Sequence, residues 1–370
     1  MGAARSGEMG QPDARVAQSA EAAQATSSRE QRQVLHLASN ENPLGPSPRA
    51  IEAARAALCE AHRYAPGSDL RLRKALAARL RVAVESVMLG AGSSELIEMA
   101  AKLVLEPGDV GVTSASSFPL YASSIRLAGA ELVETPLRGW SIDLEAIARE
   151  VEARRELVKI VYLASPNNPT GTLFTADEFE ALMARVPGDV LVVLDEAYFE
   201  YVERENYSRA AEWVKRHENL LVLRTFAKVH GLAGLRIGYG FGAAALMGQM
   251  EKVRVPFNTS VVAETAALAA MDDVEHVRRS VETNRVGMAQ LREGFEKLGL
   301  ELAPCFGNFV AVELPVEAQG VADWMAGEGV IVRPLGVLGL PKAIRATVSR
   351  ASDNERFLKA LEGALRAGGR

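Results

Sequence analysis

The feature that most constrains this fold is a repeated alternation of apolar, strand-like runs with stretches whose apolar residues recur at helical spacing. The clearest run is VLVVLD over residues 190–195, in which five apolar residues precede Asp195. Continuous apolar runs of this kind are typical of parallel strands that are covered by helices on both faces. Further strands are predicted over residues 87–89, 110–113, 132–135, 158–163 and 220–225. Helices are predicted over residues 51–58, 70–80, 95–105, 125–130, 143–153, 175–186 and 208–216. The alternation predicts an α/β fold with a large, mainly parallel sheet.

The pattern changes after Pro256. A long helical region is predicted over residues 260–298, followed by the strand-like segments FVAVEL and GVIVRPL and a final helix over 353–366. These elements predict a second, smaller α/β domain. Residues 1–33 are polar and small with no apolar run, which is the composition of a disordered extension. Residues 66–69, Pro-Gly-Ser-Asp, predict a turn between the first two helices.

Charge and composition argue against several function classes. The chain of 370 residues has a formal net charge of -5, so neither nucleic acid nor an anionic membrane is indicated as a partner. No segment approaches the roughly 20 uninterrupted apolar residues of a membrane helix. Cys59 and Cys305 lie far apart, which fits a reducing cytoplasm better than a disulfide framework. The five histidines show no paired metal-ligand spacing, so metal catalysis is disfavoured.

Three segments that follow predicted strands carry the candidate chemistry. Asp195 ends the strand VLVVLD, where a ligand would sit, although an isolated aspartate at this place could equally cap a turn. SPNNPTG, over 165–171, contains two prolines and a glycine that fix an irregular loop and would hold the Asn168 amide steady. RTFAKVHGLAGLRIGYGFG, over 224–242, places Lys228 in a small and apolar setting with Arg236 nearby. A desolvated lysine beside another cation loses proton affinity, which suits a Schiff-base amine.

Together these segments resemble the fold type I aminotransferases that depend on pyridoxal 5′-phosphate (PLP), and within them the histidinol-phosphate aminotransferase family. The resemblance covers nearly all of residues 34–366. Its landmarks, in chain order, are LASNENPLGPSP, GAGSSELI, SPNNPTG, DEAYFEY, the lysine segment, GNF and GVIVRPLGVLGLPKAIRATVSR. The resemblance implies four parts: a disordered extension over 1–33, an arm over 34–60 that packs on the small domain, a PLP-binding large domain over 61–256, and a small domain over 257–370.

The resemblance implies roles for four residues around the cofactor ring. Lys228 matches the lysine that carries PLP as a Schiff base and then moves protons. Asp195 matches the aspartate that keeps the pyridine nitrogen protonated. Asn168 and Tyr198 match the residues that hydrogen-bond the phenolate oxygen of the cofactor. The three residues expected to take part in catalysis are Lys228, Asp195 and Tyr198.

The phosphate of the cofactor would be held by side chains and by backbone amides at a helix N-terminus. The residues that match are Arg236, Thr225, Ala91, Gly92 and Ser93. Thr225 matters because Ala227 stands where this family often has a serine. Tyr64 matches a tyrosine that reaches this phosphate from the neighbouring subunit, so the resemblance implies a homodimer with a shared site.

Other matches concern the ring face and the substrate. Phe118 lies where the family places an aromatic ring on the pyridine, and Tyr121 is an alternative. Arg345 matches the arginine that receives a substrate carboxylate or phosphate, and Arg333 is a second candidate for that role or a surface ion pair. Asn40 is expected at the entrance, and Asn168 is expected to touch substrate as well as cofactor.

The predicted function is transfer of the amino group of L-histidinol phosphate to 2-oxoglutarate in a ping-pong cycle. Three rival activities use the same cofactor residues: aromatic amino-acid transamination, broad-specificity transamination and threonine-phosphate decarboxylation. A fourth possibility is a PLP-sensing regulatory module. The acidic net charge and the short, polar first 33 residues argue against that possibility, because such a module needs a DNA-reading domain.

Overall fold

A computed structural model describes residues 34–65 and 68–368, so the predicted disordered extension and residues 66–67 of the predicted turn lie outside the described residues. The strands are β1 (Leu35–His36), β2 (Val87–Gly90), β3 (Val110–Ser114), β4 (Glu131–Thr135), β5 (Leu137–Arg138), β6 (Ser141–Ile142), β7 (Val158–Ala164), β8 (Leu191–Asp195), β9 (Leu220–Thr225), β10 (Gly238–Gly242), β11 (Phe309–Glu313), β12 (Val330–Ile331), β13 (Arg333–Pro334) and β14 (Ala343–Thr347). The helices are α2 (Pro48–Ala57), α3 (Ser68–Leu80), α4 (Ser93–Val104), α5 (Pro119–Leu127), α6 (Leu144–Ala153), α7 (Ala176–Met183), α8 (Ala210–Arg216), α9 (Ala244–Met250), α10 (Val261–Asp272), α11 (Val274–Lys297), α12 (Ala318–Gly327) and α13 (Ala351–Gly368).

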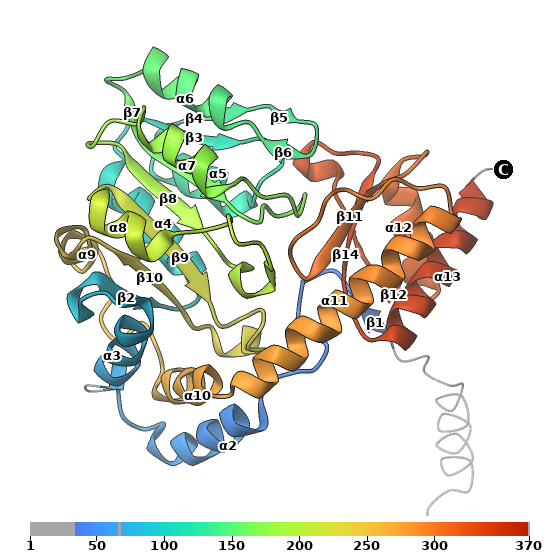
Figure 1. The fold of residues 1–370 in the computed structure, drawn as a ribbon, viewed down its shortest axis with the longest axis horizontal. Coiled ribbons are helices and arrows are strands. Elements are labelled where there is room, and N and C mark those ends of the chain that lie inside the picture. Colours follow the sequence, from blue (N-terminus) through green and yellow to red (C-terminus); the bar gives the residue numbers. More distant parts are fainter. Residues whose placement is uncertain (1–33, 66–67, 369–370) are drawn as a thin grey trace, which may run out of the picture. The chain divides into compact units, whose positions relative to one another are not determined.

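The large sheet has seven strands in the order β2-β10-β9-β8-β7-β3-β4 (Figure 1). The central pairs β9–β8, β8–β7, β7–β3 and β3–β4 are parallel, as the continuous apolar runs predicted. β10 is antiparallel to both of its neighbours. This strand was not predicted, because its sequence GYGFG has too few β-branched residues to give a strand signal.

Helices cover both faces of the sheet, which confirms the predicted fold class. Apolar residues of α3, α6, α7, α8 and α10 pack on one face, with Phe179 and Trp213 fully buried there. Residues of α4, α5 and α9, such as Leu96 and Ile125, pack on the other face. Burial on both sides explains why each residue of β7 to β9 except Lys159 is buried, so that these strands need apolar side chains at consecutive positions.

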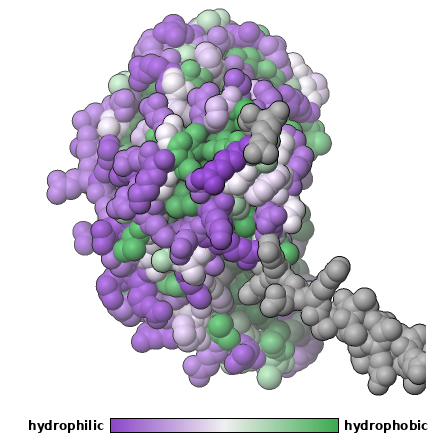
Figure 2. Space-filling model, turned by 90° about the vertical axis from the view of Figure 1, so that its right-hand side faces the viewer, coloured by the Kyte–Doolittle hydropathy of each residue, from purple (hydrophilic) through white to green (hydrophobic). Residues whose placement is uncertain are grey.

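The C-terminal part forms a smaller α/β layer. β11, β14 and β13 make an antiparallel sheet, and α12 and α13 pack together beside it. α13 also packs on α11, where the rings of Phe295 and Phe357 meet edge to face at 6.0 Å. The side of the molecule that carries α12 and α13 faces the viewer in Figure 2, where the surface is mostly hydrophilic around a small group of apolar residues.

The predicted bounds or continuity of helices and strands differ from the structure at three places. The helix expected over 125–130 begins earlier, at Pro119, because proline is favoured in the first turn of a helix. The helical region over 260–298 is two helices, broken at Asp273, whose side chain accepts a hydrogen bond from the backbone N–H of His276. GVIVRPL is two short strands rather than one.

The four-part division of the chain stays a prediction. α2 lies in the predicted arm and packs against α10, whose residues Ala263 and Ala266 belong to the core under the large sheet. The segment just before α2 instead contacts the smaller sheet: the Leu37 N–H donates to the Ile331 carbonyl at 2.8 Å, and the Thr347 N–H donates to the Leu37 carbonyl at 2.7 Å. Residues 37–57 therefore make contacts with both parts of the fold.

Candidate active site

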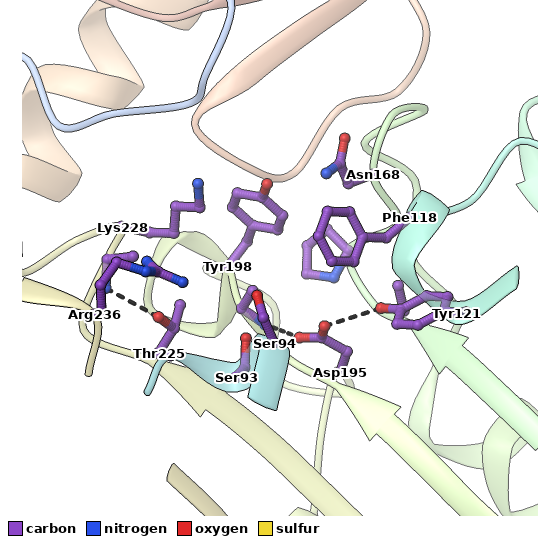
Figure 3. A pocket seen from close by; sticks show the side chains of 15 residues that line it. Ser93, Ser94, Phe118, Tyr121, Asn168, Asp195, Tyr198, Thr225, Lys228 and Arg236 are labelled. Carbon is purple, nitrogen blue, oxygen red and sulfur yellow. Dashed lines mark hydrogen bonds between the residues drawn. The ribbon is translucent and has the colours of Figure 1, made fainter. Parts of the chain in front are cut away.

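A pocket lies at the carboxyl ends of four neighbouring parallel strands. β9, β8, β7 and β3 are adjacent in the sheet, and each ends in a segment that was singled out from the sequence. Loops after parallel strands meet at one edge, so residues far apart in the chain come together there. Nine of the predicted site residues line this pocket (Figure 3): Gly92, Ser93, Phe118, Asn168, Asp195, Tyr198, Thr225, Lys228 and Arg236.

Lys228 lies in the loop after β9 and its side chain runs along the wall of the pocket. Its Nζ atom donates to the carbonyl of Ser39 at 3.2 Å and lies 5.7 Å from the ring centre of Tyr198. Burial, first, and the nearby guanidinium of Arg345, second, lower the pKa of Lys228 to about 8. The sequence predicted a desolvated lysine beside Arg236, which does contribute, but Arg345 is the stronger cationic neighbour. A neutral amine is therefore accessible near neutral pH.

Asp195 lies at the end of β8 and is 5% exposed. Its Oδ1 accepts from the N–H of Ala197 at 3.0 Å and its Oδ2 accepts from the hydroxyl of Tyr121 at 2.9 Å (Figure 3). Burial raises the pKa of Asp195 to about 6, while the Tyr121 hydrogen bond and the Ala197 N–H act in the opposite direction. The pocket thus has a buried carboxylate held by two donors.

The opposite wall is made of hydrogen-bonded polar side chains. The Tyr198 hydroxyl accepts from Nδ2 of Asn40 at 2.8 Å, and Tyr198 meets Phe309 edge to face. Oδ1 of Asn168 accepts from Nη1 of Arg345, which leaves the Nδ2 group of Asn168 pointing toward the pocket (Figure 3). Asn40 is 1% exposed and is not among the residues that line the pocket, so it supports Tyr198 rather than lying exposed at the entrance.

The two predicted substrate arginines have different surroundings. Arg345 is buried and its Nη2 donates to the carbonyl of Ala38, in the segment 38–40 that covers Lys228 through the carbonyl of Ser39. Arg333 is opposite Arg345 in the β13–β14 pair but is exposed, and it is not among the residues that line the pocket. Arg333 nevertheless contributes to lowering the pKa of Arg345, after burial. Only Arg345 is connected to the pocket by hydrogen bonds.

The other end of the pocket is a cradle between α4 and Arg236. Gly92 is the N-cap of α4 with φ 78°, and a Cβ atom there would lie 2.6 Å from Nη2 of Arg236. The guanidinium therefore packs directly over the backbone of Gly92, beside Ser93 and Ser94. Oγ1 of Thr225 accepts from the N–H of Ala227 at 3.0 Å, so its own hydroxyl hydrogen is free to donate.

One predicted phosphate contact does not have the expected geometry. The backbone N–H of Ala91 donates to Oε2 of Glu95 at 2.7 Å, and Ala91 is not among the residues that line the pocket. Glu95, in the first turn of α4, folds back onto this amide in the manner of a capping-box glutamate. The amides next to the pocket are those of Gly92, Ser93 and Ser94.

The two aromatic candidates for the ring face occupy different places. Phe118 is half-buried and lines the pocket as the residue before α5. Tyr121 is 1% exposed and stacks in parallel on Tyr162 at 5.1 Å, and its hydroxyl donates a hydrogen bond to Asp195. The hydrogen bond of Tyr121 was not predicted, since β8 and α5 are far apart in sequence. Tyr64 is 68% exposed, stacks on Phe257 at 4.1 Å and does not line the pocket of its own chain.

Two absences hold for residues 34–65 and 68–368. No group of three or more His, Cys, Asp or Glu side chains is placed to hold a metal ion. Within the same residues, none of the helices has the length and apolar character needed to cross a bilayer.

Comparison with known proteins identifies the family of this chain. The model of the family "Aminotransferase class I and II" matches residues 32–361. Histidinol-phosphate aminotransferase 1 of Nitrosococcus oceani is 44% identical over 90% of this chain and 90% of its own length. The Symbiobacterium thermophilum histidinol-phosphate aminotransferase is 43% identical, with coverages of 90% and 91%. The crystal structure of the Sinorhizobium meliloti histidinol-phosphate aminotransferase in complex with pyridoxal-5′-phosphate aligns with a TM-score of 0.85, 29% identity and 94% of each chain. The chain belongs to the aminotransferase class I and II family and, within it, to the histidinol-phosphate aminotransferases.

Proposed function

We propose that this protein is a PLP-dependent transaminase that moves the amino group of L-histidinol phosphate to 2-oxoglutarate, giving imidazole acetol phosphate and L-glutamate. One observation carries the proposal: a lysine of lowered pKa, a buried carboxylate and an arginine-glycine cradle line a single pocket. The names of the relatives support the choice of substrate, since several are histidinol-phosphate aminotransferases at 40–44% identity.

The residues of the pocket fit PLP. A dianionic phosphate suits the cradle, because Arg236 supplies a guanidinium and the N-terminus of α4 supplies backbone N–H groups and a favourable dipole. Gly92 lacks the Cβ that would push Arg236 away. Thr225 adds a hydroxyl donor, which makes up for the missing serine at Ala227. At the other end, Asn168 and Tyr198 would hydrogen-bond the phenolate oxygen.

Lys228 is the proposed anchor and proton carrier. When bound, PLP supplies an electron-accepting ring that stabilises negative charge at the substrate α-carbon. With a pKa of about 8, the Nζ atom of Lys228 is neutral in roughly a tenth of molecules at pH 7, enough to attach the cofactor and to accept a proton. Asp195 would hold a proton on the ring nitrogen, because a buried carboxylate stabilises a neighbouring positive charge.

Arg345 is the proposed receptor for the anionic end of each substrate. Its guanidinium already bridges Asn168 and Ala38, so it joins the pocket wall to the segment that covers Lys228. A planar fork suits both the carboxylate of glutamate and the phosphate of histidinol phosphate, which alternate in a ping-pong cycle. Arg333, opposite it on β13, would add a second positive charge at the substrate end. The covering segment, through Ser39 and Asn40, would exclude water from the reacting atoms.

We infer that the enzyme is a homodimer in the cytoplasm. Tyr64 is exposed and lies outside the pocket of its own chain, which suits a residue that completes the phosphate site of a partner subunit. Cys59 and Cys305 are both free thiols, as a reducing compartment allows.

Steady-state kinetics with a panel of substrates tests the proposal. We expect the highest kcat/KM for L-histidinol phosphate with 2-oxoglutarate, lower values for aromatic and other amino acids, and no carbon dioxide from threonine phosphate. Lys228→Ala is the control and should abolish turnover with every donor. A higher kcat/KM for another amino acid would replace the substrate and keep the transaminase. Binding of PLP and amines without sustained turnover would instead favour a PLP sensor.

A further inference from the structure

The hydroxyl of Tyr121 makes the side-chain hydrogen bond that supports Asp195. It donates to Oδ2 at 2.9 Å, while Oδ1 is held by the backbone N–H of Ala197. α5 carries Tyr121 and β8 carries Asp195, so this bond joins two elements of the pocket that are 74 residues apart in sequence. Both partners are at most 5% exposed, so losing the donor would leave a buried carboxylate oxygen with one partner fewer.

The packing of Tyr121 argues against a role as the ring that covers the cofactor. Its ring stacks on Tyr162 at 5.1 Å with an interplanar angle of 5°, and Phe118 meets it edge to face at 5.6 Å. Phe118 is the more exposed of the two pocket aromatics. The ring of Tyr121 is thus fixed from two sides, and its hydroxyl is aimed at the carboxylate (Figure 3).

The protonation state of Asp195 depends on this hydrogen bond, because the other surroundings of the carboxylate together raise its pKa. Burial raises the pKa of Asp195 to about 6, and the donor from Tyr121 is the largest influence that lowers it. Burial and the nearby carboxylate raise the pKa of Tyr121 well above its ordinary value, so the phenol stays protonated and remains a donor. Within this value, the carboxylate of Glu196 also raises the pKa of Asp195, and the positive charge of Lys228 lowers it.

We propose that Tyr121 is a positioning residue that keeps Asp195 ionised and oriented toward the cofactor ring nitrogen at neutral pH. The proposal rests on the proposed function, because the ionised carboxylate matters only if a basic ring nitrogen binds beside it. Tyr121 acts through Asp195: among the residues that the structure describes, its hydroxyl has no hydrogen-bond partner other than Asp195.

Tyr121→Phe removes the hydroxyl and keeps the ring. Tyr162→Phe is the matched control: Tyr162 is the neighbouring buried tyrosine, stacked on Tyr121, but its hydroxyl donates to the Ile97 carbonyl at 2.7 Å and not to Asp195. The affinity of each cofactor-free variant for PLP is measured by equilibrium dialysis from pH 5.5 to 8.5. The same measurements are made with a PLP analogue in which C–H replaces the ring nitrogen. They are also made on Asp195→Asn and on the double variant Asp195→Asn/Tyr121→Phe.

We expect Tyr121→Phe to move the acid-side loss of PLP affinity upward by about one pH unit. Starting from a pKa of about 6 for Asp195, this shift weakens binding about threefold near pH 6.5 and close to tenfold near pH 5.5. Wild type and Tyr162→Phe should have the same profile. Affinity for the C–H analogue should not respond to Tyr121→Phe, and the substitution should have no further effect in the Asp195→Asn background.

Three results would overturn the proposal. An unchanged profile in Tyr121→Phe, with PLP binding weakened by Asp195→Asn, would remove the role of Tyr121 and leave the proposed function intact. An equal loss of affinity at every pH, for PLP and the analogue alike, would make Tyr121 merely structural. No measurable PLP binding by wild type would defeat the proposed function itself, and this proposal with it.

Discussion

Gly92→Ala tests the phosphate cradle, since this glycine is required for two separate reasons. Its φ of 78° and ψ of 170° lie in a region that is essentially restricted to glycine, so a side chain there costs about 1–3 kcal/mol of conformational strain. The new Cβ would also approach Nη2 of Arg236 to 2.6 Å, and the guanidinium must move away. Loss of one charge-assisted hydrogen bond to phosphate costs about 1.5–3 kcal/mol, which corresponds to roughly 10- to 150-fold weaker binding.

The assay is the dissociation constant of PLP from the purified variant, with urea unfolding of the cofactor-free protein as a second measurement. Gly234→Ala is the control, because Gly234 lies two residues before Arg236 and a Cβ there meets nothing within 4 Å. We expect Gly92→Ala to weaken PLP at least tenfold, and Gly234→Ala to leave it within about twofold. PLP affinity within twofold of wild type in Gly92→Ala would refute the assignment of this cradle to the phosphate.

Four further predictions concern the pocket and its surroundings. Arg224→Met should destabilise the cofactor-free protein by about 3–5 kcal/mol in urea unfolding. The Glu196 carboxylate is 1% exposed and pairs with Arg224 at 2.8 Å, so the substitution leaves it as an unpaired buried charge. A loss of stability below about 1 kcal/mol would contradict this prediction. The rate at which PLP attaches to Lys228 should increase as the pH rises through about 8, because the amine loses its proton there. This rate is measured by trapping the attached cofactor with borohydride and quantifying it by mass spectrometry. Arg345→Met should move that midpoint upward, since removing a neighbouring positive charge favours the ammonium form; a downward move would show that Arg345 does not act on Lys228 in this way. Hybrid dimers can be formed by mixing the Tyr64→Phe and Lys228→Ala variants. If the site is shared, one site of each hybrid carries both substitutions and the other site carries neither, so activity should be recovered on mixing. A mixture with no recovered activity would contradict a shared site.

The parallel core of the large sheet followed from local sequence because burial on both faces demands consecutive apolar residues. VLVVLD and the runs before SPNNPTG and RTFAK satisfy that demand, and their ends gather Asp195, Asn168 and Lys228 at one edge. β10 gave no such signal. Its glycines are required by close packing against neighbouring segments. A Cβ at Gly238 would lie 2.6 Å from the backbone N of Ser93 at the start of α4, so the β-branched residues typical of strands do not fit there.

The parts of the pocket that escaped prediction depend on contacts between distant segments. The bond from Tyr121 to Asp195 spans 74 residues, and the bond from Asn40 to Tyr198 spans 158. Neither has a periodic or compositional signature. The occupied N–H of Ala91 is different, because a glutamate in the first turn of a helix is a known partner for amides at its start, and Glu95 could have been recognised.

The absorbance of the PLP-loaded protein, recorded before and after L-histidinol phosphate is added without any 2-oxo acid, tests the central claim most directly. We expect the visible band of the bound cofactor to disappear as a near-ultraviolet band grows, one imidazole acetol phosphate to form per site, and 2-oxoglutarate to restore the original spectrum. A visible band that L-histidinol phosphate leaves unchanged while another amino acid bleaches it would contradict the proposed substrate, and the absence of any visible band after PLP is supplied would contradict the account of Lys228.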